Sequence, residues 1–138
     1  MKIDNFCSGI FDLSSVLRIF TAKNYSELEL VNPRLLADLA CFGSKLGIKK
    51  IGLSSAIRSA EKLTQAGHIS RHASGMAVDI VSLNDLPVTS ADGKKLADRL
   101  VNTLVQIGYA LNRENGNKKS VLWQSKHHFD HIHVSRID

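Results

Sequence analysis

The sequence predicts a single α+β domain over residues 1–138, in which helices flank a small antiparallel sheet. Three observations support this prediction. Apolar residues recur at helical spacing in the first half and again in the middle of the chain, short strand-like runs follow near the end, and no repeat or linker divides the chain. A chain of this length buries about two-thirds of its unfolded surface, which is enough for one core.

Three segments are expected to form helices, because each combines helical spacing of apolar residues with a start or stop signal. These signals are Asp12 at the start of residues 12–22, Asn32-Pro33 and Gly47 around the second helix, and Ser90 and Gly108 around the third. An N-cap residue followed by proline favours a helix start, and glycine favours a helix end. The third segment is the most strongly amphipathic.

Short apolar runs between these helices predict strands. The expected strands are Lys50–Ser55, Met76–Val81, Tyr109–Leu111, Val121–Gln124 and His131–Ile137. The third and fourth of them flank Asn115-Gly116-Asn117, a turn signal that predicts an antiparallel hairpin. Residues 60–75 are polar and contain glycine, so we expect a loop there.

Composition and charge exclude few classes of function. The apolar fraction of 43% and the charged fraction of 22% are those of an ordinary globular protein. No run approaches the ~18 apolar residues that a membrane helix needs. The net charge of +5 favours an anionic partner, but the basic residues are scattered and no nuclease signature is present, so we expect no nucleic-acid partner. A monomer is favoured.

The N-terminal segment and the cysteines bear on localisation. Residues 1–20 mix acidic and polar residues into the region where a signal peptide would be apolar, and no small-residue cleavage site follows. We therefore expect synthesis in the cytoplasm and, if the protein acts on the cell wall, release or delivery by another system. Cys7 and Cys41 form no CxxC pair and are interpreted as reduced thiols that pack as small apolar residues.

Four of the six histidines lie between positions 127 and 133. A strand would place His131 and His133 on the same face, about 6 to 7 Å apart, because side chains alternate along a strand. Two imidazoles that point the same way, with Asp130 beside them, suit a metal site or an acid–base site better than a core. The alternative is a solvated histidine-rich edge, and His127 and His68 are interpreted as surface residues.

Asp79 lies between Val78 and Ile80 in one of the most apolar runs of the chain. Because a buried carboxylate needs a cation or hydrogen-bond donors, Asp79 requires a partner. Considered alone, Asp79 is interpreted as a buried hydrogen-bond acceptor, and His72 is interpreted as a surface residue. Together with the downstream cluster, two histidines and one aspartate fit a catalytic zinc site with its fourth position open to water. Gly75 would allow the tight turn that brings His72 toward Asp79.

Two motifs carry a resemblance to a known family. Residues 70–80 read S-x-H-x-x-G-x-A-x-D-I, and residues 130–133 read D-H-x-H. This pattern resembles the zinc D-alanyl-D-alanine carboxypeptidases, which belong with vancomycin-resistance dipeptidases, phage L-alanyl-D-glutamate endolysins, lysostaphin-type enzymes and the hedgehog domain. The resemblance covers residues 50–135. It implies a hedgehog-like or peptidase-like fold, one zinc ion per chain and hydrolysis of peptide bonds in peptidoglycan.

The resemblance also implies roles for individual residues. The zinc ligands would be His72, Asp79 and His133. Asp130, three residues before the last ligand, matches the family's general base, and His131 would lie beside the metal-bound water and stabilise charge. Zinc acidifies such a water and polarises the scissile carbonyl, while the base passes the proton to the leaving amine.

The substrate-binding residues match the family less completely. The family usually has S-G-Y-R-S where this chain has Ser55-Ala56-Ile57-Arg58-Ser59, so Arg58 matches the arginine that stabilises the oxyanion or binds substrate. The missing glycine and tyrosine leave the substrate specificity open. Ser70 and His128 are further candidates for substrate contact. The aspartate base occurs in one branch of the family, which shares the H-x-D-H-x-H pattern of residues 128–133.

Two other functions remain open. A metal-free two-histidine phosphoesterase needs two H-x-S/T motifs, and the chain has them at residues 72–74 and 133–135, but that function leaves Asp79, Asp130 and His131 unexplained. A non-catalytic zinc module of the same fold, as in hedgehog, would not need the intact Asp130 and Arg58. The sequence does not fix the bond cut, which is D-Ala-D-Ala, L-Ala-D-Glu or a cross-bridge, or the phage, toxin or housekeeping origin.

Overall fold

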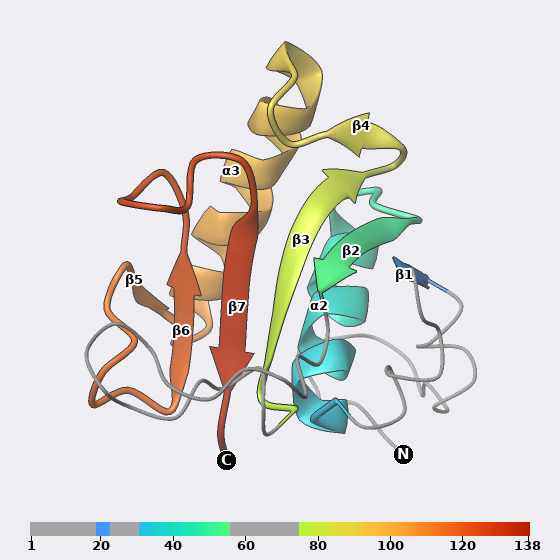
Figure 1. The fold of residues 1–138 in the computed structure, drawn as a ribbon. Helices are drawn as coiled ribbons and strands as arrows, with labels where there is room; N and C mark the ends of the chain where they lie inside the picture. The colour runs from blue at the N-terminus through green and yellow to red at the C-terminus, as the bar shows by residue number, and fades with distance from the viewer. Residues whose placement is uncertain (1–18, 23–30, 56–74) are drawn as a thin grey trace.

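A computed structural model describes residues 19–22, 31–55 and 75–138, and over these residues the chain is α+β (Figure 1). The elements are β1 (Phe20–Ala22), α2 (Pro33–Lys45), β2 (Ile51–Ser55), β3 (Ala77–Leu83), β4 (Leu86–Pro87), α3 (Ala91–Gln106), β5 (Ala110–Leu111), β6 (Lys119–Leu122) and β7 (Ile132–Arg136). The predicted α+β class is therefore confirmed. Within the described ranges, no helix is long and apolar enough to cross a membrane.

The described strands form one mixed sheet in the order β1-β2-β3-β7-β6-β5, with β4 paired to β3. The central pairs β2–β3, β3–β7 and β6–β7 are antiparallel, as expected. The edge pairs β1–β2 and β5–β6 are parallel, so the expectation of a purely antiparallel sheet is wrong at both edges. On the β1 side, helix α2 lies between the two strands in the chain, and such a crossover is what parallel pairing requires.

The ends of both helices follow the capping signals of the sequence. The Asn32 side chain accepts a hydrogen bond from the backbone N–H of Arg34, and proline occupies the first helical position of α2. The Ser90 hydroxyl accepts from the N–H of Gly93 at 3.1 Å at the start of α3. Gly47 and Gly108 follow the helices with φ of +78° and +108°, a conformation that favours glycine.

The helix expected over residues 12–22 is wrong where the structure describes it, because Phe20–Ala22 forms strand β1. Residues 12–18 lie outside the described ranges. The N–H of Ile51 donates to the carbonyl of Ile19 at 2.8 Å, and Phe20 is buried in the core. Pairing with β2 thus overrides a helical spacing that rested on only four apolar residues.

The antiparallel hairpin expected around residues 115–117 is also wrong. Strand β5 ends at Leu111, and the next residue, Asn112, has a φ of +56° that redirects the chain into a loop over residues 112–118. The Asn112 side chain accepts a hydrogen bond from the N–H of Trp123, and its own N–H donates to the carbonyl of Val121. These bonds hold the loop against β6, and β6 then runs parallel to β5.

Helices α2 and α3 cover the same face of the sheet, behind it in the view of Figure 1. On β3 and β7 that face carries Val78, Ile80, Ile132 and Val134, which are fully buried and belong to the main core. Because side chains alternate along a strand, the residues between them point to the opposite face. That face of β3, β6 and β7 carries the buried polar residues Asp79, Ser120, His133 and Ser135.

Cys41 differs from the sequence-based expectation. It is buried in α2, as predicted, but it is disulfide-bonded rather than a reduced thiol. The sequence separation of cysteines says nothing about their distance in space, so the absence of a CxxC pair was not informative. Cys7 lies outside the described residues.

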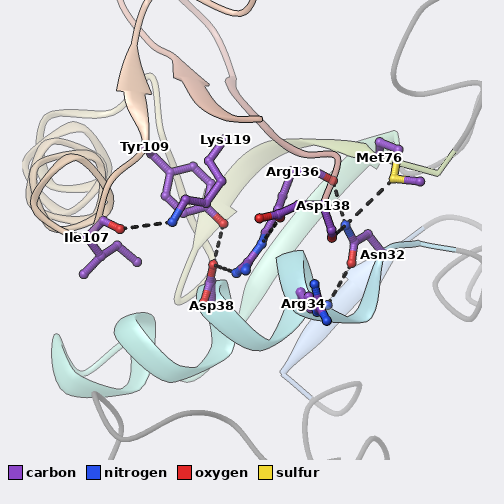
Figure 2. A network of polar contacts seen from close by, with 9 residues as sticks. All are labelled: Asn32, Arg34, Asp38, Met76, Ile107, Tyr109, Lys119, Arg136 and Asp138. Carbon is purple, nitrogen blue, oxygen red and sulfur yellow. Dashed lines mark hydrogen bonds and ion pairs between the residues drawn. The ribbon is translucent and has the colours of Figure 1, made fainter. Parts of the chain in front are cut away.

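A polar network ties the last strand to α2 and to the end of α3 (Figure 2). Asp38 accepts hydrogen bonds from the Tyr109 hydroxyl at 2.6 Å and from the Arg136 guanidinium at 2.7 Å, and Arg136 also donates to Asp138. The Asn32 side chain donates to the carbonyl of Arg136 at 2.7 Å. Burial and the Asp38 carboxylate raise the pKa of Tyr109 far above its ordinary range, so its hydroxyl remains a donor. The network therefore fixes β7 from the helical side of the sheet.

Replacing Asp38 with alanine should lower the free energy of unfolding by about 2 to 3 kcal/mol, because Tyr109 and Arg136 both lose their shared acceptor. Tyr109→Phe, which removes one of the two bonds, should cost about 1 kcal/mol. Urea denaturation measures both values. Arg34→Ala, an exposed change in the same helix, is the control and should lie within about 0.5 kcal/mol of the wild type. An Asp38→Ala variant as stable as the control would contradict this account of the network.

Candidate metal centre

Asp79 and His133 form a direct cross-strand pair at the centre of the sheet. The register of β3 and β7 places the two residues opposite each other, and antiparallel neighbours of this kind have their side chains on the same face. His133 Nδ1 lies 3.0 Å from Asp79 Oδ1. Asp79 is 2% exposed and His133 is 8% exposed. His133 is therefore a partner of the kind that the sequence required for a buried Asp79.

His131 approaches the same carboxylate from the residue before β7. Its Nε2 lies 3.8 Å from Asp79 Oδ1, and its Nδ1 lies 2.7 Å from Asp130 Oδ1. The prediction that His131 and His133 share a face is confirmed, although β7 begins at Ile132 rather than at His131. Asp130 itself is exposed to solvent, so the imidazole of His131 lies between Asp130 and the buried pair.

His128 adds a third imidazole to the group. Its ring centroid is 5.0 Å from that of His131 and 5.6 Å from that of His133. A tight turn holds it there: the N–H of His128 donates to the carbonyl of Ser125, and His127 adopts a φ of +69°. His127 is exposed, as expected. The structure thus gathers three of the four clustered histidines at Asp79.

Glu114 also contacts this group, and sequence reasoning missed it. Its Oε2 lies 2.5 Å from His133 Nε2, on the other ring nitrogen from the one that faces Asp79. Glu114 belongs to the loop between β5 and β6, just before Asn115-Gly116. A single acid beside a turn signal has no periodicity or motif, and only the packing of that loop against β7 reveals its partner.

The charges around the site shift several pKa values. Burial lowers the pKa of His133, but hydrogen bonds to Asp79 and Glu114 and the charges of both carboxylates outweigh it and raise that pKa to about 9. Both ring nitrogens of His133 therefore donate in the metal-free protein. Burial lowers the pKa of His128, which favours its neutral form. The hydrogen bond from His131 lowers the pKa of Asp130, which stays ionised at neutral pH.

The chemistry of Asp79 and His133 fits a zinc ion. Zinc binds imidazole nitrogen and carboxylate oxygen at about 2.0 to 2.2 Å, so two ligands in a tetrahedral site are about 3.3 Å apart. Nδ1 and Oδ1 of the pair are 3.0 Å apart, close to that spacing. Among the described residues alone, no three His, Cys, Asp or Glu side chains form a group that could hold a metal. The third expected ligand, His72, lies outside those residues.

Arg58 and Ser70 also lie outside the described residues, as does most of the loop expected at residues 60–75. The two ends of segment 56–74 are described. Ser55 pairs with Asp79 across β2 and β3, and Gly75 lies just before β3 with a φ of +75°, in agreement with the tight turn expected there. The carbonyl of Gly75 accepts a hydrogen bond from the N–H of Asn32. Residues 56–74 are therefore joined to the described part of the sheet at positions close to Asp79.

Trp123 does not line the site. It is 5% exposed, belongs to the main core, and donates its indole N–H to Asp98 at 2.8 Å.

The stability of the metal-free protein should depend on pH through His133. A folded-state pKa of about 9 against an ordinary value of 6.5 gives stabilisation that is complete below pH 6.5 and lost as the pH rises through 9. The shift corresponds to about 3 kcal/mol. We expect urea denaturation at pH 6 and pH 9.5, in the presence of a chelator, to show this loss in the wild type and not in His133→Gln. Equal losses in both proteins would contradict the assignment.

Comparison with known proteins identifies no relative. The chain matches no family model, no curated protein and no solved structure. The functional assignment therefore depends on the two sequence motifs and on the geometry of Asp79, His131, His133 and Glu114.

Proposed function

We propose that this chain is a zinc peptidase that hydrolyses peptide bonds in the stem peptides of bacterial peptidoglycan. The single observation that carries the proposal is the buried pair of Asp79 and His133, whose ligand atoms lie 3.0 Å apart. Each of the two sequence motifs contains one of these residues. In the proposed site His72 is the third ligand, and one zinc ion binds per chain.

The residues of the site that do not bind zinc have proposed catalytic roles. Zinc, when bound, supplies a Lewis acid that lowers the pKa of water and polarises a carbonyl. Asp130, which is exposed and ionised, accepts the proton from the attacking water and returns it to the leaving amine. His131 is oriented by its hydrogen bond to Asp130 and turns its Nε2 toward the buried pair, where it stabilises developing charge. Arg58 is proposed to stabilise the same developing charge.

The substrate is the part of the proposal that depends most on the resemblance. A net charge of +5 complements the carboxylates of peptidoglycan stem peptides. We propose that His128, whose ring contacts those of His131 and His133, binds a substrate carboxylate, with Ser70 as a second candidate. We propose that the enzyme acts as a monomer, as a D,D-carboxypeptidase or an endopeptidase, after release from or delivery out of the cell that makes it.

The geometry disfavours the two-histidine phosphoesterase. That reaction needs a histidine nitrogen that attacks phosphorus, and both ring nitrogens of His133 face carboxylates in a buried position. A non-catalytic zinc module remains the alternative. It would bind zinc with the same ligands but would not depend on Asp130, so the two functions differ in the effect of one substitution.

We expect Asp130→Ala to retain stoichiometric zinc and to lose peptidoglycan hydrolysis by at least about 100-fold, because general-base catalysis contributes factors of this size. His133→Ala should lose both zinc and hydrolysis. Metal analysis of the purified variants measures the first property. Digestion of purified peptidoglycan, with mass spectrometry of the new termini, measures the second and identifies the bond cut.

Lys126→Ala, an exposed change in the same loop, is the matched control and should retain both properties. Full activity in Asp130→Ala would refute its assignment as the base. A wild-type protein that binds zinc but releases no new termini would favour the non-catalytic module. Activity that survives removal of the metal would refute the zinc mechanism altogether.

A further inference from the structure

We propose that Glu114 is a positioning residue for the metal site, which orients His133 and fixes the ring nitrogen that binds zinc. This inference rests on the proposed function. Glu114 belongs to neither sequence motif, and it contacts the site through a loop that lies between β5 and β6.

The imidazole of His133 has two ring nitrogens, and each faces a different carboxylate. A neutral histidine carries one N–H, and the other nitrogen offers its lone pair to a metal. His133 Nε2 lies 2.5 Å from Glu114 Oε2, closer than the 3.0 Å between Nδ1 and Asp79 Oδ1, so we infer that a neutral His133 carries its one N–H on Nε2. The lone pair is then on Nδ1, the nitrogen that faces Asp79. Glu114 thus selects the tautomer that a zinc ion beside Asp79 requires.

The position of Glu114 excludes it as the zinc ligand of this pair. The two ring nitrogens of an imidazole point in different directions, so a group bonded to Nε2 cannot also reach a metal held by Nδ1. A carboxylate that accepts from the second nitrogen of a metal-binding histidine is a recurrent arrangement, in which it orients the ring and increases the basicity of the ligand.

The loop presents Glu114 in a fixed position. The carbonyl of Glu114 accepts a hydrogen bond from the N–H of Asn117, and the Asn117 side chain donates to the carbonyl of Arg113. Gly116, with a φ of +82°, allows this tight turn. The Glu114 side chain is 20% exposed, so its contact with His133 is largely shielded from water. Shielding strengthens a charge-assisted hydrogen bond, and the fixed turn reduces its entropic cost.

The test is the zinc affinity, measured by competition with a chromophoric chelator, of the wild type, Glu114→Ala, Glu114→Gln and the control Asn115→Ala. Removal of such a carboxylate typically weakens metal binding about 10- to 100-fold, which is the loss expected for Glu114→Ala. Glu114→Gln keeps an acceptor oxygen and should recover most of that loss. Asn115→Ala changes the neighbouring exposed residue and should bind as the wild type does.

A second readout is independent of whether the variants fold. In the zinc-loaded wild type, ¹⁵N NMR of the imidazoles should show His133 with its proton on Nε2. A proton on Nδ1, or equal affinities for Glu114→Ala and the wild type, would overturn the inference and leave the zinc site intact. A wild type that binds no zinc would instead overturn the proposed function, and the inference with it.

Discussion

The structure depends on one constraint: a carboxylate buried in the middle of an apolar sheet must be neutralised. Asp79 lies on a central strand, 2% exposed, and its charge is met by His133 directly across the β3–β7 register. Removing either residue would break a buried hydrogen bond between charged groups, a change that is typically strongly destabilising. Without a bound metal, a protonated His133 donates one hydrogen bond to this carboxylate and another to Glu114. In the proposed function a zinc ion takes the place of that proton.

Packing and hydrogen bonds from other parts of the fold fix the two strands that carry Asp79 and His133. Helices α2 and α3 fill the opposite face of the sheet with a continuous core, so β3 and β7 are rigid where the pair lies (Figure 1). The Asp38–Arg136 contact and the bonds around Asn32 fix the end of β7 from the helical side (Figure 2). On the other face, two short loops bring in the groups that the strands cannot supply: Glu114 on one side of His133, and Asp130 with His131 on the other.

The sequence predicted those parts that depend on local signals. Capping residues located α2 and α3, and alternation correctly placed His131 and His133 on one face. Three features depended on contacts between distant residues and were missed. Phe20–Ala22 became a strand because β2 supplies its hydrogen bonds, β5 and β6 became parallel because Asn112 redirects the chain, and Glu114 joined the site because its loop packs against β7. Local pattern contains no information about such contacts.

The most direct test of the central claim is crystallography of the zinc-loaded protein, with anomalous diffraction data collected at the zinc edge. The account predicts one strong anomalous peak between Nδ1 of His133 and the carboxylate of Asp79, about 2.0 to 2.2 Å from both. His72 should supply the third ligand, and Glu114 should remain on Nε2. A zinc ion bound elsewhere, or an Asp79–His133 hydrogen bond that persists at saturating zinc, would contradict it.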